Sequence, residues 1–446
     1  MLNVPTGHRR TLIYALMFTL STINYIDRSA LSVAAAPLAR EFQLDAVQLG
    51  YLFSSFLWLY VLCLVPMGLL VDRLGSRTVN ALGIAIWSAA TALTGLVGSF
   101  GGLLATRIIM GAGEATTYPA AGRVVREWVP QRERALFTTI FNSGAYFGPA
   151  IGALSLSWIA GMTGWRSTFF VCAAAGFVWL AAWLVWFRQP GEAGWLGVDE
   201  RAMILQERGE AAPAVDAQPG PPGTGMGITG LLRSRSMLGM MLTQGCAVYT
   251  QYLFLTWLPT YLQAARGISM VKSGWLTALP YLGAVVVTIV FGRISDSVLT
   301  TDTVRSGGRR TGVALAMLIA SAILLTPFVS DVYVILSLIM VALSGVATTV
   351  GLNIALLSDM LRSPGDAGRA TGLLIVGGNI FGILAPVVTG YVVSATGSFD
   401  YAFVVAGGLL VCGSLSALLL TRQPIAPAST IAHVRAAAGT DTSTRS

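Results

Sequence analysis

The stretch Asn24-Tyr25-Ile26-Asp27-Arg28 dominates any interpretation of this chain, because it places a carboxylate beside a guanidinium inside an apolar run. That run, from about residue 12 to residue 38, has the composition of a membrane-spanning helix. A charge at bilayer depth costs about 3 kcal/mol on insertion scales unless it is paired or lines a wet cavity. The stretch therefore predicts a pathway for ions or substrate through a helix bundle. The alternative is a buried ion pair that only joins two helices.

The composition of the whole chain is that of a polytopic membrane protein. Of its 446 residues, 54% are hydrophobic and 11% are charged, and its mean hydropathy is +0.71. A soluble domain carries about 25% charged residues. We expect an all-α protein with twelve transmembrane helices, arranged as two pseudo-symmetric halves of six, because twelve apolar stretches approach the roughly 20 residues that a crossing needs. The expected spans are 12–36, 48–71, 78–98, 101–124, 136–160, 167–187, 238–262, 273–295, 311–330, 332–357, 370–394 and 401–421.

The distribution of positive charge predicts the topology. With the N-terminus placed inside, 22 of the 28 Lys and Arg residues lie on the cytoplasmic side, four lie outside, and Arg28 and Arg107 are intramembrane. Positive residues accumulate in cytoplasmic loops, so we expect both termini in the cytoplasm. The net charge of +8 then reflects topology, and we expect no nucleic-acid partner. The four cysteines show no metal or redox spacing.

The chain is expected to divide at its longest polar segment. We predict an N-terminal six-helix half over 1–190, a cytoplasmic central loop over 191–236, a C-terminal half over 237–424 and a disordered cytoplasmic tail over 425–446. Residues 211–223 of the central loop are rich in Pro and Gly, which predicts a flexible linker.

The two halves carry a repeated loop that predicts a cytoplasmic gate. Asp72, Arg73 and Arg77 follow the second span, and Asp296 follows the eighth at the same distance from a preceding glycine. Such repeats are typical of duplicated transporter folds. A carboxylate at a helix end can meet a helix dipole or an Arg of a neighbouring helix. We expect these contacts to hold the outward-open state, with an ordinary solvated loop as the alternative.

The fourth span contains a second intramembrane acid and base. Arg107, Gly111 and Glu114 are spaced i, i+4 and i+7, so they share one helical face. With Asp27 and Arg28, the N-terminal half holds two carboxylates and two guanidiniums, and the C-terminal spans contain no comparable set. Ion coupling is therefore expected in the N-terminal half.

These residue types suit the joint handling of a proton and an anion. Burial favours the protonated form of a carboxylate and a nearby guanidinium favours the ionised form, so such a group can load and release a proton. Both histidines lie outside the spans, which leaves Asp27 and Glu114 for proton coupling. Arg28 offers a fork to a carboxylate substrate, with Tyr25 and Asn24 close by.

From the second half, Asn379 is the best polar candidate for substrate binding, with an interhelical hydrogen bond as an equal alternative. Aromatic residues near the span ends, including Tyr252 and Trp257, are interpreted mainly as interfacial belt or core packing.

The chain resembles transporters of the major facilitator superfamily, and more narrowly its anion:cation symporter family. The wider resemblance rests on the 68–77 loop, the 107–113 motif and the 144–152 motif, and it covers essentially all twelve spans. The narrower one rests on Ile23-Asn24-Tyr25-Ile26-Asp27-Arg28-Ser29-Ala30-Leu31-Ser32, on Phe141-Asn142-Ser143-Gly144, and on Thr389-Gly390-Tyr391-Val392-Val393-Ser394 with Thr396-Gly397-Ser398-Phe399.

The resemblance implies an alternating-access symporter in a bacterial inner membrane that moves an organic anion inward with protons. The anion would be a sugar acid such as a hexonate, hexuronate or aldarate. The family's proton-binding acids match Asp27 and Glu114, its carboxylate clamp matches Arg28, a substrate contact matches Tyr25, and the partner of the span-four acid matches Arg107. We expect a monomer that needs no cofactor or metal and is not an enzyme.

Two departures leave the substrate open. Sugar-acid members carry polar amides where this chain has Ala145 and Ile375. The alternative to a sugar-acid substrate is therefore an aromatic or other less hydroxylated carboxylate, similar to phthalate. Organic-phosphate antiport is disfavoured, because the seventh span has no Lys or Arg. Drug efflux fits a buried Arg poorly, and a non-transporting sensor lacks a signalling domain.

Overall fold

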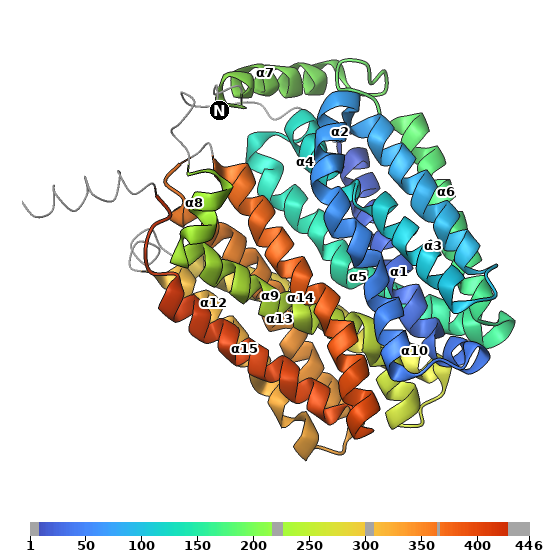
Figure 1. Cartoon of the computed structure of the whole chain (residues 1–446). Helices are drawn as coiled ribbons and strands as arrows, with labels where there is room; N and C mark the ends of the chain where they lie inside the picture. The colour runs from blue at the N-terminus through green and yellow to red at the C-terminus, as the bar shows by residue number, and fades with distance from the viewer. Residues whose placement is uncertain (1–8, 216–225, 299–306, 364–365, 427–446) are drawn as a thin grey trace, which may run out of the picture.

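The chain folds as a bundle of long helices. The computed structural model describes residues 9–215, 226–298, 307–363 and 366–426 (Figure 1). Within these ranges the only β-type pairing is an isolated bridge between Leu361 and Ile425. Each of the twelve expected spans is helical over most of its length. In the described part of the chain, eight segments are long and apolar enough to cross a membrane, and one of them, α2, covers two expected spans. The predicted all-α membrane fold is confirmed.

The helices of the first part of the chain lie side by side (Figure 1). The second and third expected spans form one long element, α2, whose helical path is broken at Gly75, where φ is 85° and ψ is 155°. A residue with a side chain adopts a positive φ reluctantly, so this glycine sets the bend. The elements are α1 (Thr11–Phe42), α2 (Ala46–Thr94), α3 (Phe100–Glu114), α4 (Thr117–Trp128), η1 (Gln131–Glu133), α5 (Arg134–Thr163) and α6 (Trp165–Trp186).

The fourth expected span is interrupted between α3 and α4, at Ala115 and Thr116. Pro119 explains the position of this break: it has no backbone N–H, and its ring crowds the carbonyl four residues earlier, which is that of Ala115. Glu114 therefore lies at the very end of α3.

The second part of the chain forms another group of helices, coloured from green through yellow to red in Figure 1. The ninth expected span changes from α-helix to 3₁₀-helix at Ser321, and the seventh ends in a turn of π-helix. The elements are α8 (Gly227–Arg233), α9 (Arg235–Thr260), η2 (Tyr261–Ala265), α10 (Met270–Val298), α12 (Gly308–Ala320), η3 (Ser321–Phe328), α13 (Val332–Met360), α14 (Ala367–Thr396) and α15 (Asp400–Leu420).

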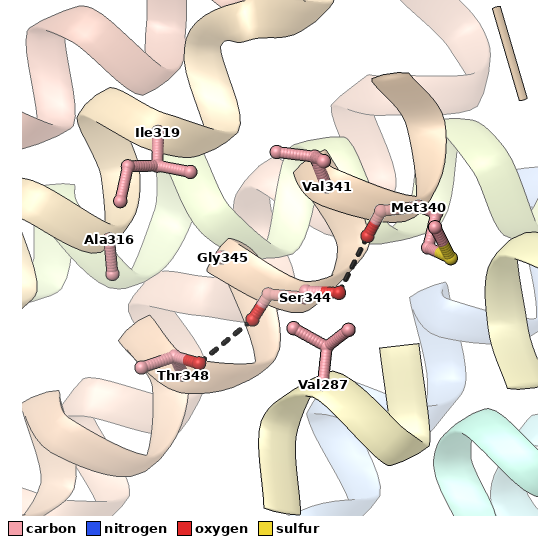
Figure 2. Close-up of a pocket in the computed structure, with 8 residues that line it drawn as sticks. All are labelled: Val287, Ala316, Ile319, Met340, Val341, Ser344, Gly345 and Thr348. Carbon is pink, nitrogen blue, oxygen red and sulfur yellow. Dashed lines mark hydrogen bonds between the residues drawn. The ribbon is translucent and has the colours of Figure 1, made fainter. Parts of the chain in front are cut away.

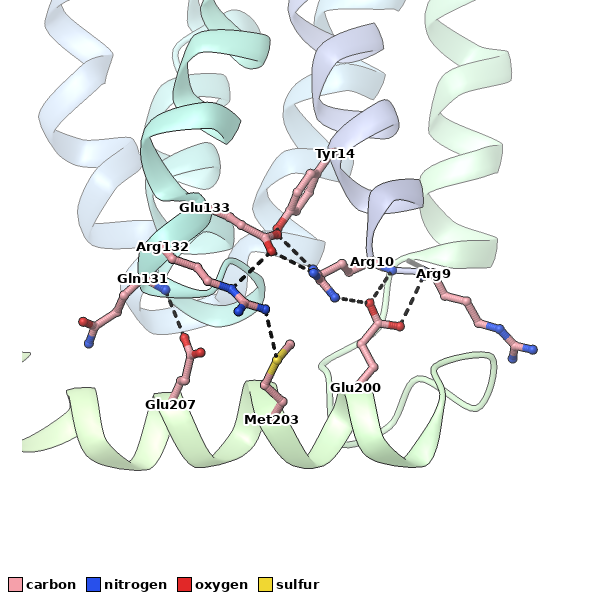
Figure 3. A network of polar contacts seen from close by, with 9 residues as sticks. All are labelled: Arg9, Arg10, Tyr14, Gln131, Arg132, Glu133, Glu200, Met203 and Glu207. Carbon is pink, nitrogen blue, oxygen red and sulfur yellow. Dashed lines mark hydrogen bonds and ion pairs between the residues drawn. The ribbon is translucent and has the colours of Figure 1, made fainter. Parts of the chain in front are cut away.

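The central loop is more ordered than its composition predicts. It contains α7 (Val198–Val215), so the flexible linker expected from residue 211 is wrong for residues 211–215, and residues 216–225 lie outside the described ranges. One face of α7 explains the difference, because Glu200, Met203 and Glu207 point from it toward the helix bundle (Figure 3). Polar contacts along this face hold the helix against the bundle.

Arg10 is the centre of those contacts (Figure 3). Its guanidinium donates to Glu200 at 2.7 Å and to Glu133 at 2.8 and 3.0 Å, and the Tyr14 hydroxyl donates to Glu133 at 2.9 Å. The backbone N–H of Gln131 donates to Glu207 at 3.0 Å. The start of α1, the turn η1 and α7 are thereby joined at one end of the bundle, which we call the terminus side.

At the opposite end, the far side, the two groups of helices touch backbone to backbone. Gly50 of α2 packs on the Pro386 carbonyl of α14, Gly390 of α14 packs on the Ala46 carbonyl, and Gly274 of α10 packs on the Ala153 carbonyl of α5. A side-chain methyl group at any of these glycines would collide with the neighbouring backbone. The far side is therefore closed in this structure.

Candidate functional site

Arg28 forms a buried contact that joins the two groups of helices. Its Nε donates to the Glu114 carboxylate at 2.8 Å, and its Nη1 donates to the Tyr252 hydroxyl of α9 at 2.9 Å. The side chains of Arg28 and Glu114 are 2% and 0% exposed. A charge-assisted contact in such surroundings is strong, so α1, α3 and α9 meet at this guanidinium.

Aromatic rings surround the same guanidinium. The Arg28 Cζ lies 4.7 Å from the ring centre of Tyr25, 5.0 Å from that of Phe56 and 5.1 Å from that of Tyr60. Ring faces attract a cation within about 6 Å. They keep the arginine charged and in place while its polar edge stays available.

Asp27, the neighbour of Arg28, points to different groups. It is 1% exposed and lies near Arg107, Glu114, Cys172 and Trp87. Neither of its carboxylate oxygens reaches hydrogen-bond geometry with a described residue. A buried carboxylate without a hydrogen-bond partner is costly as an anion.

Arg107 differs from its expected role. We predicted that it pairs with Glu114, but among the described residues the ion pair of Glu114 is made by Arg28. Arg107 lies seven residues, or about 10 Å along a helix, before Glu114. Its guanidinium stacks 5.5 Å from the Phe56 ring centre and contacts the Met110 sulfur. Its guanidinium lies near Asp27 and Glu114 without forming an ion pair with either in the described structure.

The site holds hydrogen-bonding capacity that the described residues do not use. Arg28 Nη2, Glu114 Oε1 and both side-chain polar atoms of Asn24 are buried without a partner among them. Buried polar groups in proteins are nearly always satisfied, by protein, water or ligand. The free Nη2 provides a donor for an anionic ligand beside an already paired acid.

The polar candidate from the second half is less available than expected. The Asn379 amide donates to the Ile375 carbonyl one turn earlier in α14, at 2.9 Å, so part of its capacity is used within its own helix. Ala145 is 7% exposed, and its neighbours in sequence, Gly144 and Gly148, pack directly on α1. Neither Ala145 nor Ile375 adds a polar side chain.

Among the expected gate residues, the described side chains of Asp72, Arg73 and Arg77 make no bridge to the described part of the other group of helices. Asp72 pairs with Arg126 of α4 at 3.5 Å, and both are exposed. Arg77 donates to the Leu184 carbonyl of α6 at 2.8 Å, and Arg73 makes no hydrogen bond or ion pair with the described residues. The side chain of Asp296 lies outside the described part of the chain.

Tyr252 is the residue that sequence reasoning missed. It is 5% exposed and bonded to Arg28, whereas its position predicted belt or core packing. Trp257, also buried, donates to the Pro386 carbonyl at 3.2 Å. A tyrosine facing a buried charge and one facing lipid have the same local sequence, so only the packing of α9 against α1 distinguishes them.

A cavity of about 130 Å³ lies between α10, α12 and α13, apart from these charges (Figure 2). The hydroxyls of Ser344 and Thr348, which line it, donate to the Met340 and Ser344 carbonyls of their own helix. The remaining lining is apolar, so this cavity offers an anion no free donor. Among the described residues there is also no cluster of three or more metal-binding side chains.

Comparison with known proteins identifies the family. The model of the Major Facilitator Superfamily matches residues 17–301 and 267–442. The probable galactarate/D-glucarate transporter GudP of Bacillus subtilis is 34% identical over 429 residues, covering 93% of each chain. The D-galactonate transporter of Escherichia coli O6:H1 is 31% identical over 430 residues, covering 93% of this chain and 96% of that one.

The fold agrees with a solved structure of a transporter. A bacterial homologue of the human lysosomal transporter Spinster, in an inward-facing and unoccupied conformation, superposes with a TM-score of 0.71 over 94% of this chain and 98% of that chain, at 18% identity. The family match, the relatives and the fold agree: this chain belongs to the Major Facilitator Superfamily and is a multi-pass membrane transporter.

Proposed function

We propose that this protein is a secondary active transporter that takes up a sugar-acid anion together with protons, by alternating access. The relatives named as galactarate, glucarate and galactonate transporters support the substrate class. Both substrate types are polyhydroxylated carboxylates, and a buried arginine is the side chain that best binds a carboxylate.

The observation that carries the proposal is the Arg28 guanidinium. It has one free, buried nitrogen, an acid on one side and a hydroxyl from the other half of the protein on the other. A substrate carboxylate that binds Nη2 competes with Glu114 and Tyr252 for the same cation. Substrate binding thereby changes both the charge balance at Glu114 and the contact between the halves.

We assign proton coupling to Asp27 and Glu114. When Glu114 is protonated, its attraction to Arg28 weakens and the guanidinium becomes available to the substrate. Arg107 lowers the cost of charge on Asp27 through space. Tyr25 and Asn24 contact the substrate from α1, and Asn379 contributes from α14 with the acceptor oxygen that its internal hydrogen bond leaves free.

The two halves, residues 1–190 and 237–424, are the bodies that we propose to move. We place the terminus side in the cytoplasm, with both termini there, in the inner membrane of a bacterium. The glycine contacts then close the periplasmic side, and the Asp72, Arg73 and Arg77 cluster, with Asp296, is the cytoplasmic gate in its open state. We propose a monomer, because each site is complete within one chain.

A less hydroxylated carboxylate is the second candidate substrate. The rings of Tyr25, Phe56 and Tyr60 around Arg28, together with the apolar Ala145 and Ile375, favour a flat apolar body behind the carboxylate. Sugar hydroxyls need hydrogen-bond partners, which Phe56, Ala145 and Ile375 do not supply.

Transport by the purified protein in proteoliposomes tests the proposal. We expect uptake of labelled galactarate, glucarate or galactonate, stimulated by a pH gradient that is acidic outside, and loss of uptake in Arg28→Lys, which keeps the charge but not the fork. Arg166→Lys, at an exposed pair with Glu41, is the matched control and should transport normally. Preference for phthalate would select the second candidate, and no uptake of any carboxylate would refute the proposal.

A further inference from the structure

A row of buried polar side chains leads from the central acids toward the terminus side, inside the first half of the protein. We call Asn24, Thr117, Asn80 and Ser76 the polar row. The first three are 1%, 1% and 0% exposed, and none of their side-chain polar atoms has a hydrogen-bond partner among the described residues. Unsatisfied groups are rare in protein interiors, so three of them in succession require an explanation.

The inner end of the row touches the acids. Asn24 precedes Asp27 by about one turn of α1 and lies beside the Glu114 carboxylate without reaching hydrogen-bond geometry. Thr117 follows Glu114 by three residues across the break between α3 and α4. The two residues between them, Ala115 and Thr116, keep right-handed helical backbone angles, so the chain continues from Glu114 to Thr117 in the direction of the terminus side.

From the packing of α2 against α3 and α4 we infer that Asn80 lies next to Thr117. Gly83 of α2 packs on the Gly113 carbonyl and on the Thr116 side chain. This part of α2 runs antiparallel to α3 and α4. The residue one turn before Gly83 on α2 therefore faces the residue one turn after Gly113, at the start of α4. That step places Asn80 opposite Thr117.

At its outer end, the row meets the carboxylate of Glu127. Ser76 precedes Asn80 by one turn, and its hydroxyl donates to Glu127 of α4 at 3.4 Å. The other oxygen of Glu127 accepts from Arg123 at 2.6 Å. The Glu127 side chain is 6% exposed and that of Arg123 22%, and the exposed Asp72–Arg126 pair lies just beyond. The row therefore begins at buried acids and ends close to solvent.

We propose that the polar row is a water-lined route for proton release, which starts beside the substrate site at Asn24 and then runs inside the first half, away from the substrate path between the two halves. Asp27 and Glu114 are 1% and 0% exposed while the far side is closed, so a proton on either needs a connection to the terminus side. Waters bound by the unpaired amides and hydroxyls complete the hydrogen bonds of the row. The proton passes from Glu114 through successive water and hydroxyl groups to Glu127 and from Glu127 to solvent water, and each transfer breaks one O–H bond and forms the next.

This inference rests on the proposed proton coupling, and its test keeps the two apart. The double variant Asn80→Leu with Thr117→Val removes the polar atoms at nearly constant size. We expect uptake driven by a pH gradient to fall about tenfold, the effect of a barrier raised by about 1.4 kcal/mol, while counterflow of labelled galactarate, which needs no net proton release, stays at the wild-type rate. When Asn80→Ser replaces Asn80→Leu in the double variant, a polar group is kept at this position, and most of the driven uptake should be recovered.

Thr349→Val is the matched control, since Thr349 is a fully buried threonine with an unpaired hydroxyl in the other half. It should leave both rates unchanged. Equal loss of driven uptake and counterflow in the double variant would mean that the row only supports packing, and unchanged driven uptake would mean that protons leave elsewhere; either result overturns the route. Absence of proton movement with substrate in the wild type would instead overturn the proposed coupling itself.

Discussion

Arg10 and Arg28 are both buried arginines, one at the start of α1 and one in its middle. They differ in how many of their side-chain nitrogens are hydrogen-bonded. At the start of α1, all three side-chain nitrogens of Arg10 donate to the carboxylates of Glu133 and Glu200. In the middle of α1, Arg28 donates from two nitrogens and leaves the third unpaired. Their side chains are 5% and 2% exposed, so burial does not distinguish them.

We propose that this contrast separates the structural role of Arg10 from the substrate-binding role of Arg28. A guanidinium whose three nitrogens all donate hydrogen bonds within the protein has no free donor for a ligand, and it joins helices to one another. A buried guanidinium with an unpaired nitrogen keeps a donor for a ligand that binds and dissociates. The same criterion separates the satisfied network at the terminus side from the central acids, where Asp27 and Glu114 both retain unpaired oxygens.

The largest expected effect follows from removing Arg28. Arg28→Ala leaves Glu114 buried and unpaired, which costs about 3–5 kcal/mol when one partner of a buried pair is lost. We expect loss of substrate binding together with a lower melting temperature in detergent. Arg28→Ala combined with Glu114→Gln should recover thermal stability but not binding. Binding by the double variant would show that Arg28 is not the clamp.

Removing Arg10 should affect stability alone. Arg10→Gln loses charge-assisted bonds, each worth about 1.5–3 kcal/mol, and we expect weaker docking of α7, measured as faster hydrogen exchange in residues 198–207. Transport per folded molecule should stay near the wild-type value. A transport defect as large as that of Arg28→Ala would end the distinction between the two sites.

Acidification should loosen the same network. The hydrogen bonds from Arg10 hold the pKa of Glu133 below its ordinary value of 4.5. A carboxyl whose folded pKa is depressed adds stability above its unfolded pKa and loses it as pH falls through the lower, folded value. Melting temperatures should therefore fall more steeply below about pH 4.5 in the wild type than in Glu133→Gln, and parallel curves would contradict this role.

The smallest effect is expected at the exposed far-side pair. Arg166 donates to Glu41 at 2.6 and 2.8 Å, and both side chains are about 40% exposed. Exposed pairs contribute about 0–1 kcal/mol. Glu41→Gln should shift the melting temperature only slightly, and high salt should remove even that shift in the wild type. A fall in melting temperature as large as that of Arg10→Gln would show that the exposed fraction of an ion pair does not predict its contribution to stability.

The sequence predicted the fold well, because hydropathy over about 20 residues reports membrane spans directly. It also selected Asp27, Arg28, Arg107 and Glu114, since charges are rare in such spans. The pairing among these residues was not predictable. Whether Arg28 or Arg107 reaches Glu114 depends on how α1 and α3 are rotated and on the break that Pro119 introduces.

Other features depend on contacts that no local pattern reports. Tyr252 meets Arg28 across more than 200 residues of sequence. The helical residues 211–215 continue a helix whose position is set by the contacts of Glu200 with Arg10 and of Glu207 with Gln131, far away in the sequence. The Asn379 side chain could turn to its own helix or away from it, and spacing alone does not decide between these orientations.

Asp27→Asn in proteoliposomes tests the coupling of anion and proton most directly. The amide keeps the size of the side chain but cannot bind and release a proton. We expect counterflow of labelled galactarate to persist while accumulation driven by a pH gradient, and the proton influx that accompanies it, disappear. Accumulation at the wild-type level in this variant would contradict the assignment of Asp27 to proton coupling.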